Sequence, residues 1–184
     1  PEDHAEMIAH HWRSAYELAL AAGLDGDDLA DRTRVALRDA GDRAYGLSAY
    51  PAAAGYYGEA LELWPTADPS RADVLFRRAR SLHLATDDRR EQALVEAHDA
   101  LLAVGDNAQA AEASSFLARI AWYQGGQDAA LRHLEVAEQL IAGMPPSGSK
   151  TRVLAQSARH RILGGDTENG IQLANAALEM AREL

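Results

Sequence analysis

The stretch Ala49–Pro65, AYPAAAGYYGEALELWP, places several alanines between large aromatic residues and ends at a proline. This mixture is notable because aromatic residues make up only 6% of the chain. Small residues allow two helix backbones to approach closely, and a bulky residue one turn away fills the space beside them. We therefore predict that Tyr57 is a buried packing residue, that Pro65 ends its helix, and that Trp64 covers the following turn.

Helical periodicity extends from this stretch over the rest of the chain. Apolar or small residues recur three and four positions apart, and no segment shows the sustained alternation that is typical of β-strands. Short breaks rich in Gly, Asp or Pro separate the predicted helices, so successive helices should be antiparallel neighbours. Four aspartates are predicted to be N-caps: Asp27, Asp68, Asp106 and Asp166. The predicted helices span residues 3–22, 27–46, 50–64, 69–85, 89–104, 107–124, 127–142, 148–163 and 167–183.

A pattern of small and large residues repeats along these helices. Small residues of paired helices are 12 positions apart in three units, namely Gly41 and Ala53, Ala118 and Ala130, and Ala158 and Gly170. The remaining unit pairs Ala79 with Ala93, 14 positions apart, so its loop carries extra residues. The small residues of the second helices, including Ala53, Ala130, Ala137 and Ala174, are predicted to lie at close helix contacts.

The first of these repeats, which contains Gly41 and Ala53, resembles the tetratricopeptide repeat family. Leu37 stands where a tryptophan is commoner, and Tyr57 is in the aromatic position. The resemblance implies an all-α, right-handed α-solenoid built from about four helical hairpins. We expect the hairpins to occupy residues 25–184 and a leading helix, within residues 1–24, to connect them to an upstream domain. The residues that carry the resemblance are Leu37, Ala40, Gly41, Ala44, Ala53, Tyr57, Ala60 and Pro65.

Four stretches resemble one particular setting for such repeats, the helical region of large ATP-binding signalling regulators, mostly from actinobacteria. These regulators include STAND-type and LuxR-type transcriptional regulators and relatives joined to nucleotide-cyclase domains. The resemblance implies that the repeats follow an ATPase module and act as a sensor or interaction arm. The stretches are AHHW (Ala9–Trp12), YYGEALELWP (Tyr56–Pro65), AWYQGGQDAALRHLEVAEQL (Ala121–Leu140) and PPSGSKTRVLAQSA (Pro145–Ala158).

Composition narrows the classes of partner. The formal net charge of −10 argues against direct binding to nucleic acid. No apolar run approaches the roughly 20 residues that span a bilayer, so we expect no membrane insertion. The absence of cysteine excludes disulfides and thiolate metal sites and fits a cytoplasmic location. Because the chain starts at Pro1 and ends within a helical pattern, we expect it to be a piece of a longer protein.

The sequence contains no strong motif for catalysis or for phosphate binding. The stretch GMPPSGSKT, Gly143–Thr151, superficially resembles a phosphate-binding loop. A serine separates its glycine from Lys150, a helix precedes it, and two prolines remove backbone donors, so it is predicted to be a linker. No arrangement of nucleophile, base or paired carboxylates stands out. We expect no enzymatic activity, no cofactor and no metal.

One set of residues gives a stronger indication of a binding site than these motifs do. The position after the first small residue of each unit holds Asp42, Arg80, Arg119 and Arg159. Three positions further, one turn along the same face, lie Tyr45, His83, Trp122 and Ile162. In a tetratricopeptide array this face would line the concave groove, where arginines beside aromatic rings suit a carboxylate. The predicted groove residues are Tyr45, Arg80, His83, Arg119, Trp122, Tyr123 and Arg159. The alternative is that these arginines are solvated and paired with nearby acids.

Two hypotheses for the function follow. The first is a binding and regulatory module whose partners are a protein or an anionic small-molecule effector, together with other domains of the parent chain. The second is a scaffold that self-associates by stacking terminal helices, so that the partner is another copy of the chain. An apolar patch on an end helix would favour the second hypothesis.

Overall fold

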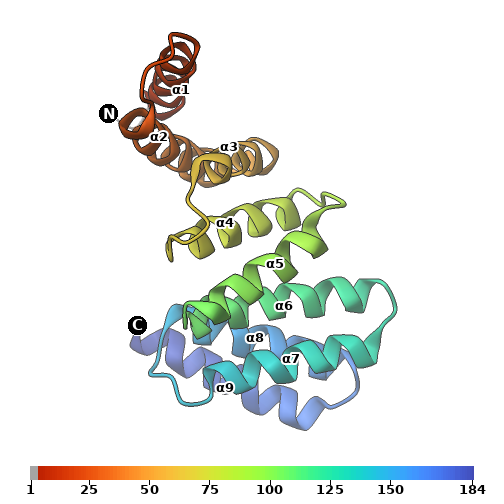
Figure 1. The fold of residues 1–184 in the computed structure, drawn as a ribbon. Helices are drawn as coiled ribbons and strands as arrows, with labels where there is room; N and C mark the ends of the chain where they lie inside the picture. Colours follow the sequence, from red (N-terminus) through yellow and green to blue (C-terminus); the bar gives the residue numbers. More distant parts are fainter. Residues whose placement is uncertain (1–3) are drawn as a thin grey trace. The chain divides into compact units, whose positions relative to one another are not determined.

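The computed structural model describes residues 4–184, and this part of the chain is entirely helical with short connections (Figure 1). No β-strand occurs among these residues. The all-α prediction is therefore confirmed, and the helix ends differ from the predicted ones by at most two residues, apart from the predicted start at residue 3, which lies outside the described range. The helices are α1 (Ala5–Ala21), α2 (Asp27–Gly46), α3 (Tyr50–Leu63), α4 (Arg71–Leu84), α5 (Arg90–Ala103), α6 (Asn107–Tyr123), α7 (Gln127–Ile141), α8 (Gly148–Leu163) and α9 (Thr167–Glu183).

The chain divides into two compact units, and the boundary falls inside α5. The first unit ends at Ala93, and within it α1 contacts α2, α2 contacts α3, and α3 contacts α4. The second unit runs from Leu94 to Leu184. Within the second unit α6 contacts α7, both of these helices contact α8, and α8 contacts α9. Most of these contacts join helices that are neighbours in the sequence, and α8 also packs against α6, two helices earlier.

Tyr57 is the main packing residue of the first unit. It is only 1% exposed, and its ring lies directly over Gly41 of α2, which has no side chain to obstruct it. The Tyr57 hydroxyl donates a 2.6 Å hydrogen bond to Asp42, and Arg77 of α4 donates to the same carboxylate and to Asp73. Burial and then the bond to Asp42 raise the pKa of Tyr57. This network ties α2, α3 and α4 to one carboxylate and confirms the predicted role of Tyr57.

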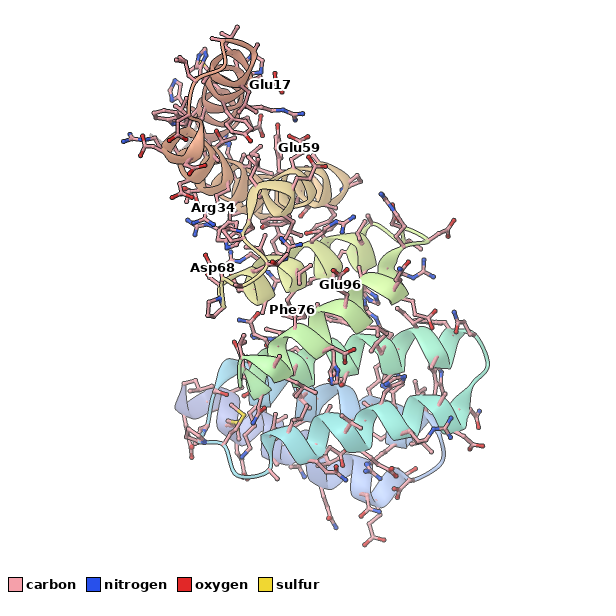
Figure 2. All side chains as sticks on the ribbon, viewed as in Figure 1. Glu17, Arg34, Glu59, Asp68, Phe76 and Glu96 are labelled. Carbon is pink, nitrogen blue, oxygen red and sulfur yellow. The ribbon has the colours of Figure 1, made fainter. Side chains whose placement is uncertain are left out.

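Trp64 covers the turn between α3 and α4, as predicted. Its side chain is buried, and its indole Nε1 donates a 3.0 Å hydrogen bond to Ser70 Oγ. The Arg34 guanidinium lies 4.9 Å from the indole centroid, within the range of a cation–π interaction. Arg34 also forms an ion pair of 3.5 Å with Asp68, which precedes α4 (Figure 2). The aromatic residue at the end of α3 therefore fixes where α4 begins.

The predicted N-caps are only partly confirmed. Asp106 is an N-cap, because its carboxylate accepts a 3.0 Å hydrogen bond from the backbone N–H of Gln109. Asp166 occupies the N-cap position of α9, but its carboxylate accepts from the side-chain amide of Asn169 instead of a backbone donor. A nearby amide side chain has thus displaced the expected backbone bond.

The predictions for Asp27 and Asp68 are wrong. Asp27 is the first residue of α2, Gly26 holds the cap position, and Asp25 accepts the hydrogen bond from the Asp27 backbone N–H. Asp68 lies before the cap residue Ser70 and accepts from its backbone N–H at 2.9 Å. In both places an aspartate bonds to the N–H two residues later, which forms a turn before the helix and not a cap within it.

The second unit has a core of small and branched side chains from three helices. Val153 of α8 packs with Ala111 of α6 and with Ala137 and Ile141 of α7, and all four side chains are buried. The predicted contact residues Ala53, Ala130 and Ala137 have no exposed surface. Ala174 of α9 is an exception, because it is exposed and not at a buried helix contact.

Ala130→Leu should lower the free energy of unfolding by about 1–3 kcal/mol, because a larger side chain does not fit a helix contact without displacing its neighbours. Ala130 has no exposed surface on α7, which packs against α6. Urea denaturation of the wild type and the variant measures the difference. An unchanged denaturation midpoint would contradict the assigned helix register.

Candidate functional site

The seven residues predicted to line a groove fall into two groups, one in each unit. Tyr45, Arg80 and His83 belong to the first unit. The other four, Arg119, Trp122, Tyr123 and Arg159, belong to the second unit. Each group is described by itself below. A groove shared by all seven residues stays a prediction.

In the first unit the structure brings Arg80 and Tyr45 together. The Arg80 guanidinium carbon lies 4.4 Å from the Tyr45 ring centroid and 5.9 Å from that of Phe76, which is cation–π geometry. The Nε atom of Arg80 is buried and has no hydrogen-bond partner among the described residues. A buried donor without a partner costs free energy, and the N–H groups of a guanidinium suit a carboxylate.

His83 lies one turn further along α4, and its side chain is only 8% exposed. It is buried and not presented on a surface. In this structure a ligand bound to Arg80 would therefore contact the Tyr45 ring and not the imidazole of His83.

In the second unit the arginines of α6 and α8 lie close enough to affect each other. Burial lowers the pKa of Arg119, the nearby Tyr123 opposes this shift, and the like charge of Arg159 adds to it. The Arg119 guanidinium carbon lies 5.6 Å from the Phe116 ring centroid. Arg159 is exposed on α8. Two cations held near each other form a surface that an anion would stabilise.

Aromatic residues flank these cations. Trp122 makes an edge-to-face contact with His160 of α8, with ring centroids 5.5 Å apart. Tyr123, the last residue of α6, is 73% exposed and available for contact with a ligand. The sequence repeat predicts that cations and aromatic rings lie next to each other on α6 and α8, and a shared binding surface of these residues stays a prediction. Such surfaces bind carboxylates and phosphates through paired hydrogen bonds and ring stacking.

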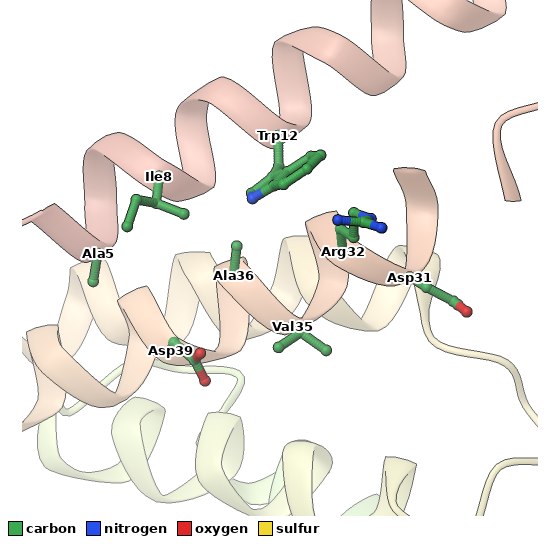
Figure 3. A pocket seen from close by; sticks show the side chains of 8 residues that line it. All are labelled: Ala5, Ile8, Trp12, Asp31, Arg32, Val35, Ala36 and Asp39. Atoms are coloured by element: carbon green, nitrogen blue, oxygen red, sulfur yellow. The ribbon is translucent and has the colours of Figure 1, made fainter. Parts of the chain in front are cut away.

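A pocket between α1 and α2 was not predicted from the sequence (Figure 3). Its volume is about 540 Å³, and Ile8 and Trp12 of α1 face Ala36 of α2 across it. The Arg32 guanidinium carbon lies 5.1 Å from the Trp12 ring centroid. Arg32 is also paired with Asp28 at 2.9 Å. The pocket is therefore mainly apolar, with a cation that already has a partner.

The stretch Gly143–Thr151 forms the connection into α8. The Ser147 hydroxyl accepts a hydrogen bond from the Lys150 backbone N–H and is the N-cap of α8. The Lys150 ammonium donates a 2.7 Å hydrogen bond to the Met144 carbonyl oxygen. The lysine thus stabilises its own turn, in agreement with the interpretation of this stretch as a linker.

Two further properties concern the described part of the chain, residues 4–184. It holds no group of three or more His, Cys, Asp or Glu side chains placed to bind a metal ion. None of the helices found there combines the length and the apolar character that a membrane crossing requires.

Comparison with solved structures supports the fold. A crystal structure of MamA matches 92% of this chain and 86% of its own, with 17% sequence identity and a TM-score of 0.57. MamA from Desulfovibrio magneticus RS-1, residue 41 to the end, matches 96% of each chain, with 15% identity and a TM-score of 0.57. Identities this low show the fold alone, and the fold is the tetratricopeptide-like α-solenoid expected from the repeat pattern. No protein-family model matches the chain, and no curated protein sequence matches it.

Proposed function

We propose that this chain is a protein-binding module without enzymatic activity of its own, and that its arginine and aromatic clusters bind a carboxylate-bearing peptide or an anionic small-molecule effector. The fold supports the first part, because helical repeats of this type present surfaces to other proteins. The resemblance of the sequence to ATP-binding regulators supports a finer proposal. In it, the chain is the regulatory arm of a multidomain, cytoplasmic, ATP-dependent transcriptional or signalling regulator.

The observation that carries the proposal is the environment of Arg80. Its guanidinium is stacked on Tyr45, and its buried Nε lacks a hydrogen-bond partner among the described residues. The chain has a net charge of −10, so carboxylates that could pair with Arg80 are plentiful. A lack of acidic residues therefore does not explain why the Arg80 Nε has no hydrogen-bond partner among the described residues. In the second unit, Arg159 is close enough to Arg119 for its like charge to contribute to the lowered pKa of Arg119.

Citrate, a compact tricarboxylate, should raise the melting temperature of the protein above that in sodium chloride of equal ionic strength. Binding to the native state stabilises it by mass action, and each kcal/mol raises the melting temperature of a chain of this size by about 2–4 °C. Differential scanning calorimetry measures the shift. Arg119→Ala should reduce it most and Arg80→Ala should reduce it less.

The matched control is Arg132→Ala, which removes an equal charge from an exposed position of α7 outside both clusters. Citrate should raise the melting temperature of this variant as much as that of the wild type. Equal losses of the citrate effect in Arg119→Ala and Arg132→Ala would show a general charge effect and would contradict the proposed site.

Self-association is the second candidate, and the exposed side chains of α1 favour it. Met7, Ile8, Leu18 and Leu20 are all at least 44% exposed on this helix. An apolar surface of this kind often marks a protein contact, and in a self-associating scaffold a second copy would cover it.

A further inference from the structure

A polar pocket of about 250 Å³ lies in the first unit, between α3, α4 and the turn that follows α4. Sites for drug-sized ligands have roughly 300–1,000 Å³, so this pocket suits a smaller molecule. Ala54 and Leu82, both buried, form part of its apolar wall. The seven predicted groove residues, all within residues 4–184, lie outside this pocket. Its charged lining residues are Glu59, Glu62, Arg78, Asp87 and Arg89.

Two glycines of α3, Gly55 and Gly58, line the pocket. Glycine weakens a helix interior relative to alanine, so its presence at both positions needs a reason. Packing among the described residues does not supply one. A methyl group added at Gly55 would have none of their atoms within 4 Å, and one added at Gly58 would make an ordinary 3.5 Å contact with Arg78 Nε. The glycines instead leave open the space that a ligand would occupy.

Three of the five charged lining residues already have partners. Glu59, labelled in Figure 2, is paired with Arg13 of α1. Asp87 accepts hydrogen bonds from the Arg89 backbone N–H at 2.9 Å and from the Arg89 guanidinium at 2.9 Å and 2.8 Å. The charges of these three residues are therefore neutralised within the protein.

Arg78 and Glu62 carry the two charges that remain. Within the described range, residues 4–184, neither side chain makes a hydrogen bond or an ion pair. Hydrogen bonds from Arg89 lower the pKa of Asp87, and the more distant charge of Arg78 adds a smaller contribution. Arg78 therefore lies near the turn that forms one wall of the pocket. The pocket thus offers one cation and one anion that the protein does not use itself.

We propose that this pocket binds a small zwitterion, whose carboxylate pairs with Arg78 and whose ammonium group pairs with Glu62. A lone anion or a lone cation would use only one of the two charges. A guanidinium donates paired hydrogen bonds to a carboxylate, and an ammonium group donates to a carboxylate in turn. Gly55 and Gly58 allow the ligand to approach the helix backbone closely. The proposal does not rest on the proposed function, because the two sites share no residue.

A series of amino acids provides the probes. Glycine, β-alanine, γ-aminobutyrate and ε-aminocaproate differ mainly in the distance between their two charges. Isothermal titration calorimetry of the 184-residue chain should give saturable binding for at least one of them, with a dissociation constant in the millimolar range or below. The analogues of that compound without the ammonium or without the carboxylate group should bind at least about tenfold more weakly, because each loses a charge-assisted hydrogen bond. For γ-aminobutyrate these analogues are butyrate and butylamine.

Variants of the protein locate the binding site. Arg78→Gln and Glu62→Gln should each weaken the affinity at least about tenfold. Gly55→Leu should weaken it to a similar extent by filling the open space, and circular dichroism checks that the fold is kept. The control for Glu62→Gln is Asp88→Asn, which removes a negative charge at an exposed position that does not line the pocket. The control for Arg78→Gln is Arg132→Gln at an exposed position of α7. Both controls should leave the affinity unchanged.

Three results would overturn the proposal. One is the lack of saturable binding for every member of the series. Another is equal affinity for the zwitterion and for one of its singly charged analogues, since only one of the two charges would then be used. The third is an equal loss of affinity in Glu62→Gln and Asp88→Asn, which would show a general charge effect and not a site.

Discussion

Gly41→Ala should lower the free energy of unfolding by about 2–3 kcal/mol. A methyl group at this position would lie 2.6–2.9 Å from three atoms of the Tyr57 ring, well inside contact distance. The ring is fully buried, and its hydroxyl is bound to Asp42, so it can move only by giving up a hydrogen bond and disturbing its neighbours. These losses exceed the gain of up to about 1 kcal/mol in helix propensity. Urea denaturation measures the net effect.

Gly55→Ala is the matched control for this prediction. Gly55 lies in α3, is exposed, and has no atom within 4 Å of the position of an added methyl group. The same substitution should raise stability there by about 0.5–1 kcal/mol. If both variants changed stability by the same amount in the same direction, helix propensity alone would explain the result and the Tyr57 contact would be irrelevant.

Arg152→Ala should lower the free energy of unfolding by about 2–3 kcal/mol. Arg152 of α8 donates two hydrogen bonds to the Glu112 carboxylate of α6, at 2.6 Å and 3.0 Å. The Glu112 side chain is only 6% exposed, whereas that of Arg152 is 60% exposed. Loss of the arginine leaves a buried carboxylate without its counter-ion, which costs far more than the loss of an exposed pair. Because the arginine is exposed, the expected loss is smaller than the roughly 3–5 kcal/mol that follows when a fully buried ion pair loses one partner.

A second substitution separates the cost of the buried charge from the loss of packing. Glu112→Gln in the Arg152→Ala background removes the charge, so most of the lost stability should return. Arg182→Ala, at an exposed position of α9, should change stability by less than about 0.5 kcal/mol. A double variant no more stable than Arg152→Ala alone would show that the buried carboxylate is not the source of the loss.

The features of the fold that depend on local spacing could be predicted from the sequence. Tyr57 over Gly41 and the buried Ala130 follow from small and large residues at helical spacing, which act through the nearest helix. Whether Asp27 and Asp68 are helix caps could not be predicted, because several polar residues compete for a few backbone donors at each turn. Which of them binds depends on differences of one residue in the start of the helix.

The candidate site was predictable to the extent that it depends on the repeat. The proximity of Arg119 and Arg159 follows from their spacing of 40 positions on successive repeats. The exposure of Ala174 could not be predicted in the same way, because the same pattern buries Leu134 on α7. The difference depends on the next helix and not on the residues themselves. The sequence pattern therefore finds contact surfaces, and the structure shows which of them are uncovered.

The order of the helix contacts has a consequence for how the second unit opens. The contacts follow the chain from α6 to α9, and α9 packs against α8 at the end of this order. Such a linear arrangement can lose its last helix while the rest stays folded, unlike a core in which every element separates at once. The amide hydrogens of α9 should therefore exchange with solvent through a local opening that leaves α6 and α7 protected.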